Sequence, residues 1–253
     1  MLKADWIEHL HKFRTRELEI VFKQIDKKFQ KGLELGAGDG FQSQLLINYV
    51  DSLIATDLNG DRLPTKSNFP NIQYLVLDAE KVGSAFEPKS FDIVFSSNLM
   101  EHLPNVHNCF NGIHQILKDD GIAIHVMPSP NWRLFATILH FPNKLYNLLD
   151  VIFFGRKRKK GKGNNLKLNA KRQSRIKNFF IPKPHGISSN FISEFFAFRR
   201  KKWINDFEET NFKVLKIIPG PVSSGYGFGW DRLRMMLENL GIATEYIYFV
   251  QKK

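Results

Sequence analysis

A short apolar strand that runs directly into a glycine-rich turn constrains the fold of this chain more than any other feature. The stretch Leu33–Gly40 has the sequence LELGAGDG, with three glycines within five residues, and a helix-like run follows from Phe41 to Val50. Strand, glycine turn and helix in this order bring a cofactor against the backbone at the edge of an α/β sheet. The sequence therefore predicts an α/β fold with a cofactor at this turn.

Segments typical of strands alternate with segments typical of helices along most of the chain. Apolar runs rich in Ile, Val, Leu and Phe predict strands at Leu33–Leu35, Leu53–Asp57, Ile72–Asp78, Phe91–Ser97, Gly121–Met127, Phe212–Ile218 and Glu245–Val250. Helical periodicity predicts helices over 3–30, 106–117, 190–209 and 231–240. We therefore expect a Rossmann-like, mostly parallel seven-stranded sheet with helices on both faces and an antiparallel last strand.

The alternation stops at Pro128-Ser129-Pro130 and resumes at Ser188. Between these points, an apolar and aromatic run from Trp132 to Phe154 precedes Arg156–Lys177, a segment with eleven Lys and Arg residues and no acid. This break predicts an insertion after the fifth strand. We expect a single domain whose parts are an N-terminal helix (1–30), a cofactor-binding core (31–128), a basic and aromatic insertion or lid (129–187) and the C-terminal part of the sheet (188–253).

Charge and composition narrow the class of protein. The 253-residue chain has a formal net charge of +12, and Arg156–Lys177 accounts for nearly all of it. The single cysteine, Cys109, excludes an internal disulfide and fits a reducing compartment. Residues 1–12 mix acids and bases with apolar residues, unlike a signal peptide, and no apolar run has the length of a membrane-spanning helix. These features predict a cytoplasmic protein.

The spacing and the acids of the glycine turn indicate which cofactor it holds. A dinucleotide-binding turn has the pattern G-x-G-x-x-G, whereas Phe41 stands where its third glycine would fall. Glu34 and Asp39 lie in or beside the turn, and a carboxylate repels a pyrophosphate at short range. The same carboxylates suit S-adenosylmethionine, which carries an ammonium and a sulfonium and no phosphate.

Two further acids follow at the ends of the next two predicted strands. Asp57 lies 21 residues after Gly36, where a carboxylate accepts hydrogen bonds from both ribose hydroxyls of an adenosine cofactor. Asp78 can accept a hydrogen bond from the adenine amino group, and the backbone N–H of Ala79 can meet a ring nitrogen. Because the carboxyl ends of parallel strands share one edge, the sequence predicts an acidic wall there.

Together, these motifs resemble the class I S-adenosylmethionine-dependent methyltransferases, and within them the type 11 group. The resemblance rests on Leu33–Gly40, Asp57, Asp78-Ala79 and Phe91–Leu103, and it covers residues 30–128 with a weaker match from Pro184 onward. It implies that Glu34, Gly36 and Gly38 hold the methionine end, Asp57 the ribose, Asp78 the adenine, and that Asn98 lies near the methyl group. Ala37, Leu58, Ala79 and Leu99 are the adjoining positions expected at the same cofactor site.

Two histidines are candidates for a general base, which methyl transfer needs only when the acceptor must lose a proton. His102 lies four residues after Asn98, at the edge where the acceptor must enter, or it orients the loop before Pro104. His185 lies where the insertion rejoins the domain, or it is held by turn contacts. His107 and His114 have no third ligand beside them in the sequence, so no metal site is expected.

The predicted function is S-adenosylmethionine-dependent methyl transfer, by direct displacement, to a small-molecule, sugar or lipid-linked acceptor. The aromatic run followed by a basic cluster, residues 132–177, suits peripheral binding to an anionic membrane surface, or else forms a lid packed on the sheet. An RNA methyltransferase that uses the basic insertion is an alternative. A non-catalytic cofactor-binding protein is another.

Overall fold

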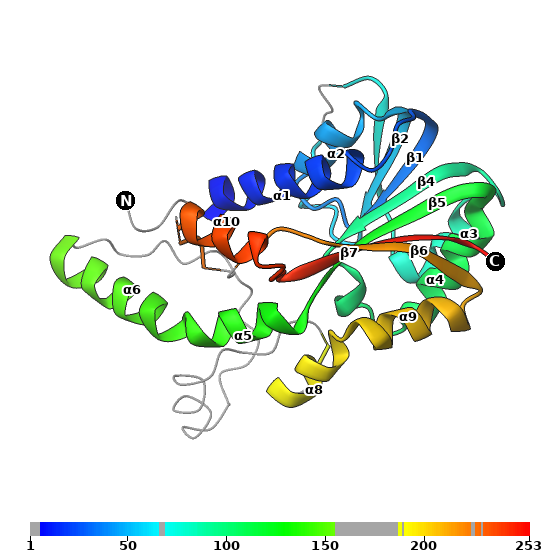
Figure 1. The fold of residues 1–253 in the computed structure, drawn as a ribbon. Helices are drawn as coiled ribbons and strands as arrows, with labels where there is room; N and C mark the ends of the chain where they lie inside the picture. The colour runs from blue at the N-terminus through cyan, green and yellow to red at the C-terminus, as the bar shows by residue number, and fades with distance from the viewer. Residues whose placement is uncertain (1–5, 66–68, 155–186, 189, 224–225, 229) are drawn as a thin grey trace, which may run out of the picture.

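One seven-stranded sheet organises the computed structural model, which describes residues 6–65, 69–154, 187–188, 190–223, 226–228 and 230–253 (Figure 1). The strands lie in the order β3-β2-β1-β4-β5-β7-β6. Their bounds are β1 (Phe29–Leu35), β2 (Val50–Asp57), β3 (Ile72–Val76), β4 (Phe91–Ser97), β5 (Leu117–Pro128), β6 (Phe212–Pro219) and β7 (Glu245–Lys252). Neighbours from β3 to β5 are parallel, while β7 is antiparallel to both β5 and β6. This topology confirms the predicted mostly parallel sheet with an antiparallel last strand.

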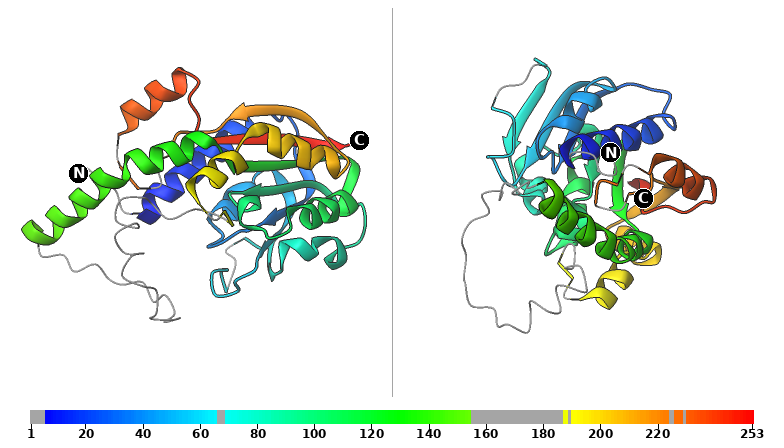
Figure 2. Two further views of the ribbon diagram at one scale, coloured as in Figure 1. Left: turned by 90° about the horizontal axis from the view of Figure 1, so that it is seen from below. Right: turned by 90° about the vertical axis from the view of Figure 1, so that its left-hand side faces the viewer.

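Helices cover both faces of the sheet (Figures 1 and 2). One side holds α1 (Trp6–Phe22) and α2 (Phe41–Leu46), with α10 (Asp231–Asn239) beside α1. The other side holds α3 (Val82–Ala85), α4 (Val106–Ile116) and α9 (Arg200–Glu209), while α8 (Phe191–Ala197) precedes α9. Two short 3₁₀ helices, η1 (Ala79–Lys81) and η2 (Met100–His102), follow β3 and β4.

The sheet separates two hydrophobic cores because side chains alternate between its faces along each strand. In β5, Ala123 belongs to one core and Ile124 to the other. Phe110 of α4 and Phe207 of α9 fill the first core, and Val21 of α1 packs in the second. Burial on both faces explains why the parallel strands are continuously apolar in the sequence rather than alternating.

Several element boundaries differ from the sequence prediction. The N-terminal helix, expected over 1–30, ends at Phe22, and Phe29 already belongs to β1. Phe29 fits the helical period, but its backbone N–H donates to the Tyr49 carbonyl at 2.9 Å and its register partner is Val50. Strand pairing therefore overrides the local helical pattern. The helix expected over 190–209 is two helices, because the chain bends at Phe198-Arg199 and buries Phe198.

The insertion begins with two helices, α5 (Pro130–Ile138) and α6 (His140–Phe154), which extend away from the sheet (Figure 1). Ser129 caps α5 by accepting a hydrogen bond from the Asn131 N–H at 3.2 Å, and Pro130 occupies the first turn. The basic segment 156–177 and His185 lie outside the described residues. Among the helices that are described, none combines the length and the apolar character needed to cross a bilayer.

Candidate active site

A cavity of about 910 Å³ lies at the carboxyl ends of the central parallel strands. One wall comes from the ends of β1 to β4 and includes Gly36, Asp57, Asp78 and Asn98. The opposite wall comes from α1, α5, α6 and the residues around the start of β7. The cavity therefore joins the predicted cofactor side to a second chamber built from elements far away in the sequence.

Most of the predicted site residues meet at this cavity. Those that line it are Gly36, Asp57, Leu58, Asp78, Ala79, Asn98, Leu99 and His102. Glu34, Ala37 and Gly38 are not among the described residues that line it. They lie instead within or behind the turn, so their contacts are with the protein, and their predicted contact with the methionine end stays a prediction.

The glycine turn packs tightly against its neighbours. Gly36 has φ +77°, a backbone conformation that L side chains rarely adopt, and a Cβ there would lie 3.2 Å from Leu99 Cδ1. The N–H groups of Gly36 and Ala37 both donate to the Thr56 carbonyl at 2.8 Å. The turn is thereby held against the end of β2, and its first glycine leaves the backbone exposed to the cavity.

Asp57 and Asp78 combine local structural contacts with a position on the cavity wall. Asp57 Oδ2 accepts a hydrogen bond from the Gly38 N–H and Oδ1 from the Asn59 N–H, both at 2.9 Å. Asp78 caps η1 by accepting from the Glu80 N–H at 3.1 Å. A wall with carboxylates at two strand ends fits the ribose and adenine of S-adenosylmethionine, whose lack of phosphate avoids charge repulsion.

Glu34 lies behind the glycine turn. Its side chain is buried, and Oε2 accepts a hydrogen bond from Ser43 Oγ at 2.5 Å. Burial raises the pKa of Glu34 to about 7, and the nearby carboxylates of Asp39 and Asp57 add to this effect. Glu34 thus links β1 to α2 and carries a proton that is gained or lost near neutral pH.

Helix α1 contributes a buried polar network that the sequence analysis did not identify. Glu17 is fully buried, and its Oε1 lies 2.6 Å from Arg14 Nη1. Glu17 Oε2 accepts hydrogen bonds from Ser97 Oγ at 2.8 Å and Gln42 Nε2 at 3.1 Å. Arg14 and Ser97 also line the cavity. The sequence shows these polar residues on an amphipathic helix, but it does not show that they lie on the buried side. That becomes clear only once α1 is placed against the sheet.

Glu245, the first residue of β7, faces the end of β4. Asn98 Nδ2 donates to Glu245 Oε2 at 3.3 Å, and both residues line the cavity. Burial, reinforced by the neighbouring Glu17 carboxylate, raises the pKa of Glu245 well above its usual range, while Arg14 opposes the shift. Asn98 itself has φ +49°, a strained conformation that Asn tolerates better than most residues and that is common at functional sites.

The first two helices of the insertion close the cavity. Arg133 of α5 pairs with Glu194 of α8, with Arg133 Nε and Glu194 Oε2 3.0 Å apart and both side chains buried. His140 Nδ1 of α6 lies 3.0 Å from the hydroxyl of Tyr226. Arg133, His140 and Tyr226 all line the cavity. This part of the insertion is therefore a wall of the site rather than a separate appendage.

The two histidines predicted as bases differ in what the structure describes. His102, on η2, lines the cavity with a side chain that is 43% exposed, and its Nε2 lies 3.8 Å from Glu101 Oε1. Its role as a base stays a prediction. His185 lies outside the described residues.

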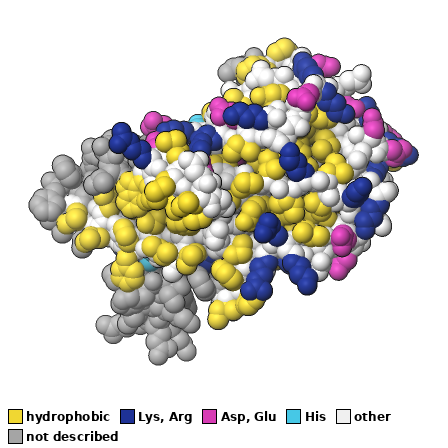
Figure 3. Space-filling view, in the orientation of Figure 1, with side chains coloured by type: hydrophobic (Ala, Val, Ile, Leu, Met, Phe, Trp, Pro, Cys, Tyr) yellow, Lys and Arg dark blue, Asp and Glu magenta, His cyan; other side chains and the backbone are white. Residues whose placement is uncertain are grey.

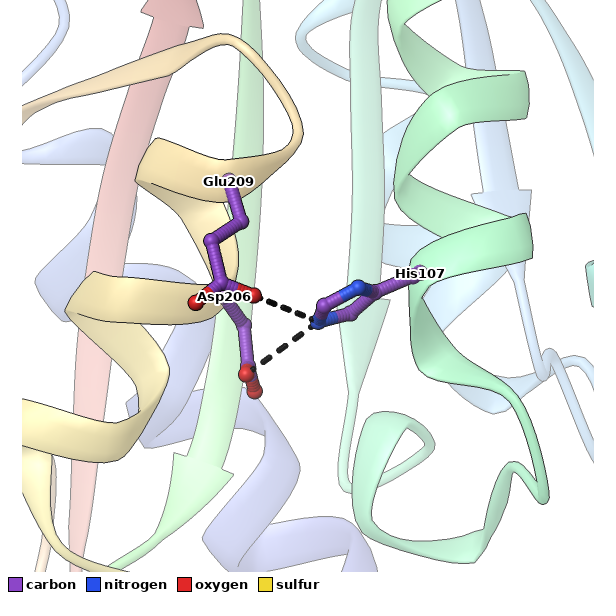
Figure 4. A group of neighbouring side chains, drawn as sticks. All are labelled: His107, Asp206 and Glu209. Atoms are coloured by element: carbon purple, nitrogen blue, oxygen red, sulfur yellow. Dashed lines mark hydrogen bonds and ion pairs between the residues drawn. The ribbon is translucent and has the colours of Figure 1, made fainter.

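A cluster of side chains joins α4 to α9 outside the cavity lining (Figure 4). His107 Nε2 lies 3.3 Å from Asp206 Oδ1 and 3.7 Å from Glu209 Oε2. The sequence analysis found no third ligand for His107 and His114 because the carboxylates come from α9. Lys202 Nζ already lies 2.5 Å from Asp206 Oδ2, so the cluster works as an ion-pair link between two helices.

Comparison with known proteins agrees with this site. Residues 33–125 match the family model described as a methyltransferase domain, of type 11. A ubiquinone biosynthesis O-methyltransferase from Glaesserella parasuis is 28% identical over 130 residues, which cover 48% of this chain and 50% of that protein. A highly reducing polyketide synthase from Pyrenophora dematioidea is 26% identical over 122 residues, 42% of this chain and 5% of that protein. The chain thus spans half or less of the length of these relatives.

Solved structures share the fold over almost the whole chain. A SAM-dependent methyltransferase from Archaeoglobus fulgidus has a TM-score of 0.54 at 16% identity, covering 98% of this chain and 100% of its own. One from Mesorhizobium loti has a TM-score of 0.56 at 14% identity, covering 94% and 98%. At such identities the likeness shows the fold alone. Residues 33–125 therefore resemble the methyltransferase domain of type 11, and the whole chain shares the fold of S-adenosylmethionine-dependent methyltransferases.

Proposed function

We propose that this methyltransferase transfers the methyl group of S-adenosylmethionine directly to a small-molecule, sugar or lipid-linked acceptor. The observation that carries the proposal is a cavity in which the acidic strand ends face a second chamber walled by α1, α5 and α6. A bound sulfonium supplies a methyl group on a good, neutral leaving group. The protein's task is then mainly to align the acceptor with that methyl group and to exclude water.

The size of the cavity and the relatives support an acceptor of modest size. A volume of about 910 Å³ is in the range of pockets that hold small ligands and cofactors. The relatives named above are a ubiquinone O-methyltransferase and a polyketide synthase, and both names point to small or lipid-like organic molecules. Trp132 and Ala136 of α5 give the acceptor chamber apolar surface beside its charged groups. We therefore rank such an acceptor above RNA.

We further propose that the enzyme works at an anionic membrane surface, on its cytoplasmic side. Five apolar side chains that are 42–59% exposed follow one helical spacing along α5 and α6, at Leu134, Ile138, Phe141, Leu145 and Leu149. Apolar side chains gather on this projecting part of the molecule (Figure 3). Such an apolar stripe, followed in the chain by the basic segment 156–177, suits a peripheral membrane contact.

Replacing both Phe141 and Leu145 by Ser tests the membrane contact. We expect the variant to float with anionic phosphatidylserine vesicles at least about tenfold less than the unmodified chain, because each apolar side chain moved into lipid contributes about 1.5–3 kcal/mol. Leu240→Ser, at the end of α10 and 69% exposed, is the matched control and should float normally. Equal flotation of the unmodified chain, the double variant and Leu240→Ser would contradict the apolar contact. Unchanged flotation after deletion of 156–177 would contradict an electrostatic contribution of the basic segment to membrane binding.

Transfer of label from tritium-methyl S-adenosylmethionine into fractions of a cell extract tests the acceptor class. We expect label in the lipid or small-molecule fraction, and the Asp57→Ala variant as a control should transfer none. Label in the RNA fraction would instead support the RNA methyltransferase. If no fraction is labelled although the cofactor binds, the chain is a non-catalytic cofactor-binding protein.

A further inference from the structure

The strand order places Glu245 on the acceptor side of the cavity. The chain runs outward in both directions from the adjoining β1 and β4, with β2 and β3 on one side and β5, β7 and β6 on the other. Ligands bind in the crevice at such a switch point. Asp57 and Asp78, at the ends of β2 and β3, face the cofactor half. Glu245 begins β7 opposite Pro128, the last residue of β5, and thus belongs to the other half.

The Glu245 carboxyl group is buried and only partly satisfied. The residue is 3% exposed, Oε2 accepts one hydrogen bond from Asn98, and Oε1 has no hydrogen-bond partner among the residues that the structure describes. Gly220 makes room for it, because a Cβ at that position would lie 2.6 Å from Glu245 Cγ. A buried carboxyl oxygen that lacks a donor is costly, and such a group is expected where a ligand supplies the donor.

The charged groups around Glu245 keep its proton affinity high. Besides burial, the Glu17 carboxyl group of α1 raises the pKa of Glu245, through its charge and through a hydrogen bond between the two carboxyl groups, while Arg14 and the hydrogen bond from Asn98 oppose the shift. Arg133 of α5 also lines the cavity, but it pairs with Glu194. A raised pKa makes the carboxylate, once it has formed, a stronger base than an ordinary carboxylate. His102, in contrast, is 43% exposed and lies beside Glu101.

We propose that the Glu245 carboxylate accepts a hydrogen bond from the reacting O–H or N–H group of the methyl acceptor and takes its proton as the methyl group transfers. The acceptor oxygen or nitrogen forms a bond to the methyl carbon. The carbon–sulfur bond breaks with its electron pair on sulfur, and the acceptor proton passes to Glu245. The acceptor is therefore a hydroxyl or amine compound rather than a carbon nucleophile. This assignment rests on the proposed methyl transfer.

Calorimetry with two cofactor analogues tests the position of Glu245 without knowledge of the acceptor. S-adenosylhomocysteine lacks the methyl group, and sinefungin carries a primary amine in its place. For Glu245→Gln we expect S-adenosylhomocysteine affinity within about twofold of the unmodified chain, and sinefungin affinity lower by about tenfold or more, since a charge-assisted hydrogen bond is lost. Glu208→Gln, an exposed acid on α9, is the matched control and should change neither affinity.

The pH dependence provides a second readout, which can first be measured on the unmodified chain. The pKa of Glu245 is raised, so its carboxylate forms only as the pH rises through that value. The preference for sinefungin over S-adenosylhomocysteine should therefore increase with pH in the unmodified chain and in His102→Gln, but not in Glu245→Gln. Equal losses for both analogues, or a preference that is independent of pH, would overturn the assignment. If the unmodified chain binds neither analogue, the proposed function itself fails.

Discussion

Asp57→Ala is expected to lower the affinity for S-adenosylhomocysteine by about 100-fold, since a lost hydrogen bond to a charged group costs about 1.5–3 kcal/mol. The effect is large because Asp57 has two roles. Its carboxylate is expected to bind the ribose hydroxyls, and it also accepts hydrogen bonds from the N–H groups of Gly38 and Asn59. Without it, the turn that faces the cofactor loses its anchor. Isothermal titration calorimetry of the purified chain measures this change.

Two further variants separate the roles of Asp57. Asp57→Asn keeps the shape and one of the two acceptor oxygens, so one backbone contact of the turn can survive while the affinity falls by about tenfold. Asp61→Ala removes an exposed acid from the same loop, and it should leave binding unchanged. If Asp57→Ala binds S-adenosylhomocysteine as tightly as the unmodified chain, the cofactor does not lie at the end of β2, and the assignment of the cofactor half is wrong.

Arg133→Met is expected to destabilise the fold by about 3–5 kcal/mol, the cost of breaking a buried ion pair by removing one of its two charges. Arg133 Nε lies 3.0 Å from Glu194 Oε2, and the side chains are 1% and 0% exposed. Removing the guanidinium leaves the Glu194 carboxylate buried without this cation. The contact also joins α5 to α8, so its loss loosens one wall of the cavity. Urea unfolding followed by circular dichroism measures the change.

The double variant Arg133→Met with Glu194→Leu decides whether the ion pair is responsible. Replacing both residues by apolar side chains also removes the buried carboxylate, so we expect stability closer to that of the unmodified chain than to that of Arg133→Met alone. Lys12→Met breaks an ion pair whose side chains are 62% and 52% exposed, and it should cost less than about 1 kcal/mol. A double variant as unstable as Arg133→Met would show that packing, rather than charge, explains the loss.

The cavity wall at the ends of the parallel strands could be predicted from the sequence because its residues have fixed local relations to strands. Gly36 and Asp57 each stand where an apolar strand ends, and parallel strands deliver their carboxyl ends to one edge. Glu34 shows the limit of such reasoning. It precedes the turn as predicted, but alternation along β1 turns its side chain toward Ser43, and it does not appear in the lining of the cavity.

The opposite wall of the cavity could not be predicted because its residues meet only through long-range packing. Glu17 contacts Ser97 across 80 residues, and Asn98 contacts Glu245 across 147 residues. No spacing rule links such positions, and the sequence does not distinguish a buried carboxylate from a solvated one. Helix periodicity was likewise insufficient at Phe29, where pairing with β2 decides the conformation.

By itself, the sequence determined the class of fold, the methyl donor and the acids at the strand ends that line the cavity, because strand period, turn chemistry and strand-end position are local properties. Only the tertiary structure decided that α1 and α5 wall the same cavity, that Arg133 is paired with Glu194, and that Glu245 lies buried beside Asn98. Burial and pairing set the charge and reactivity of these groups, and both depend on which distant segments the fold brings together.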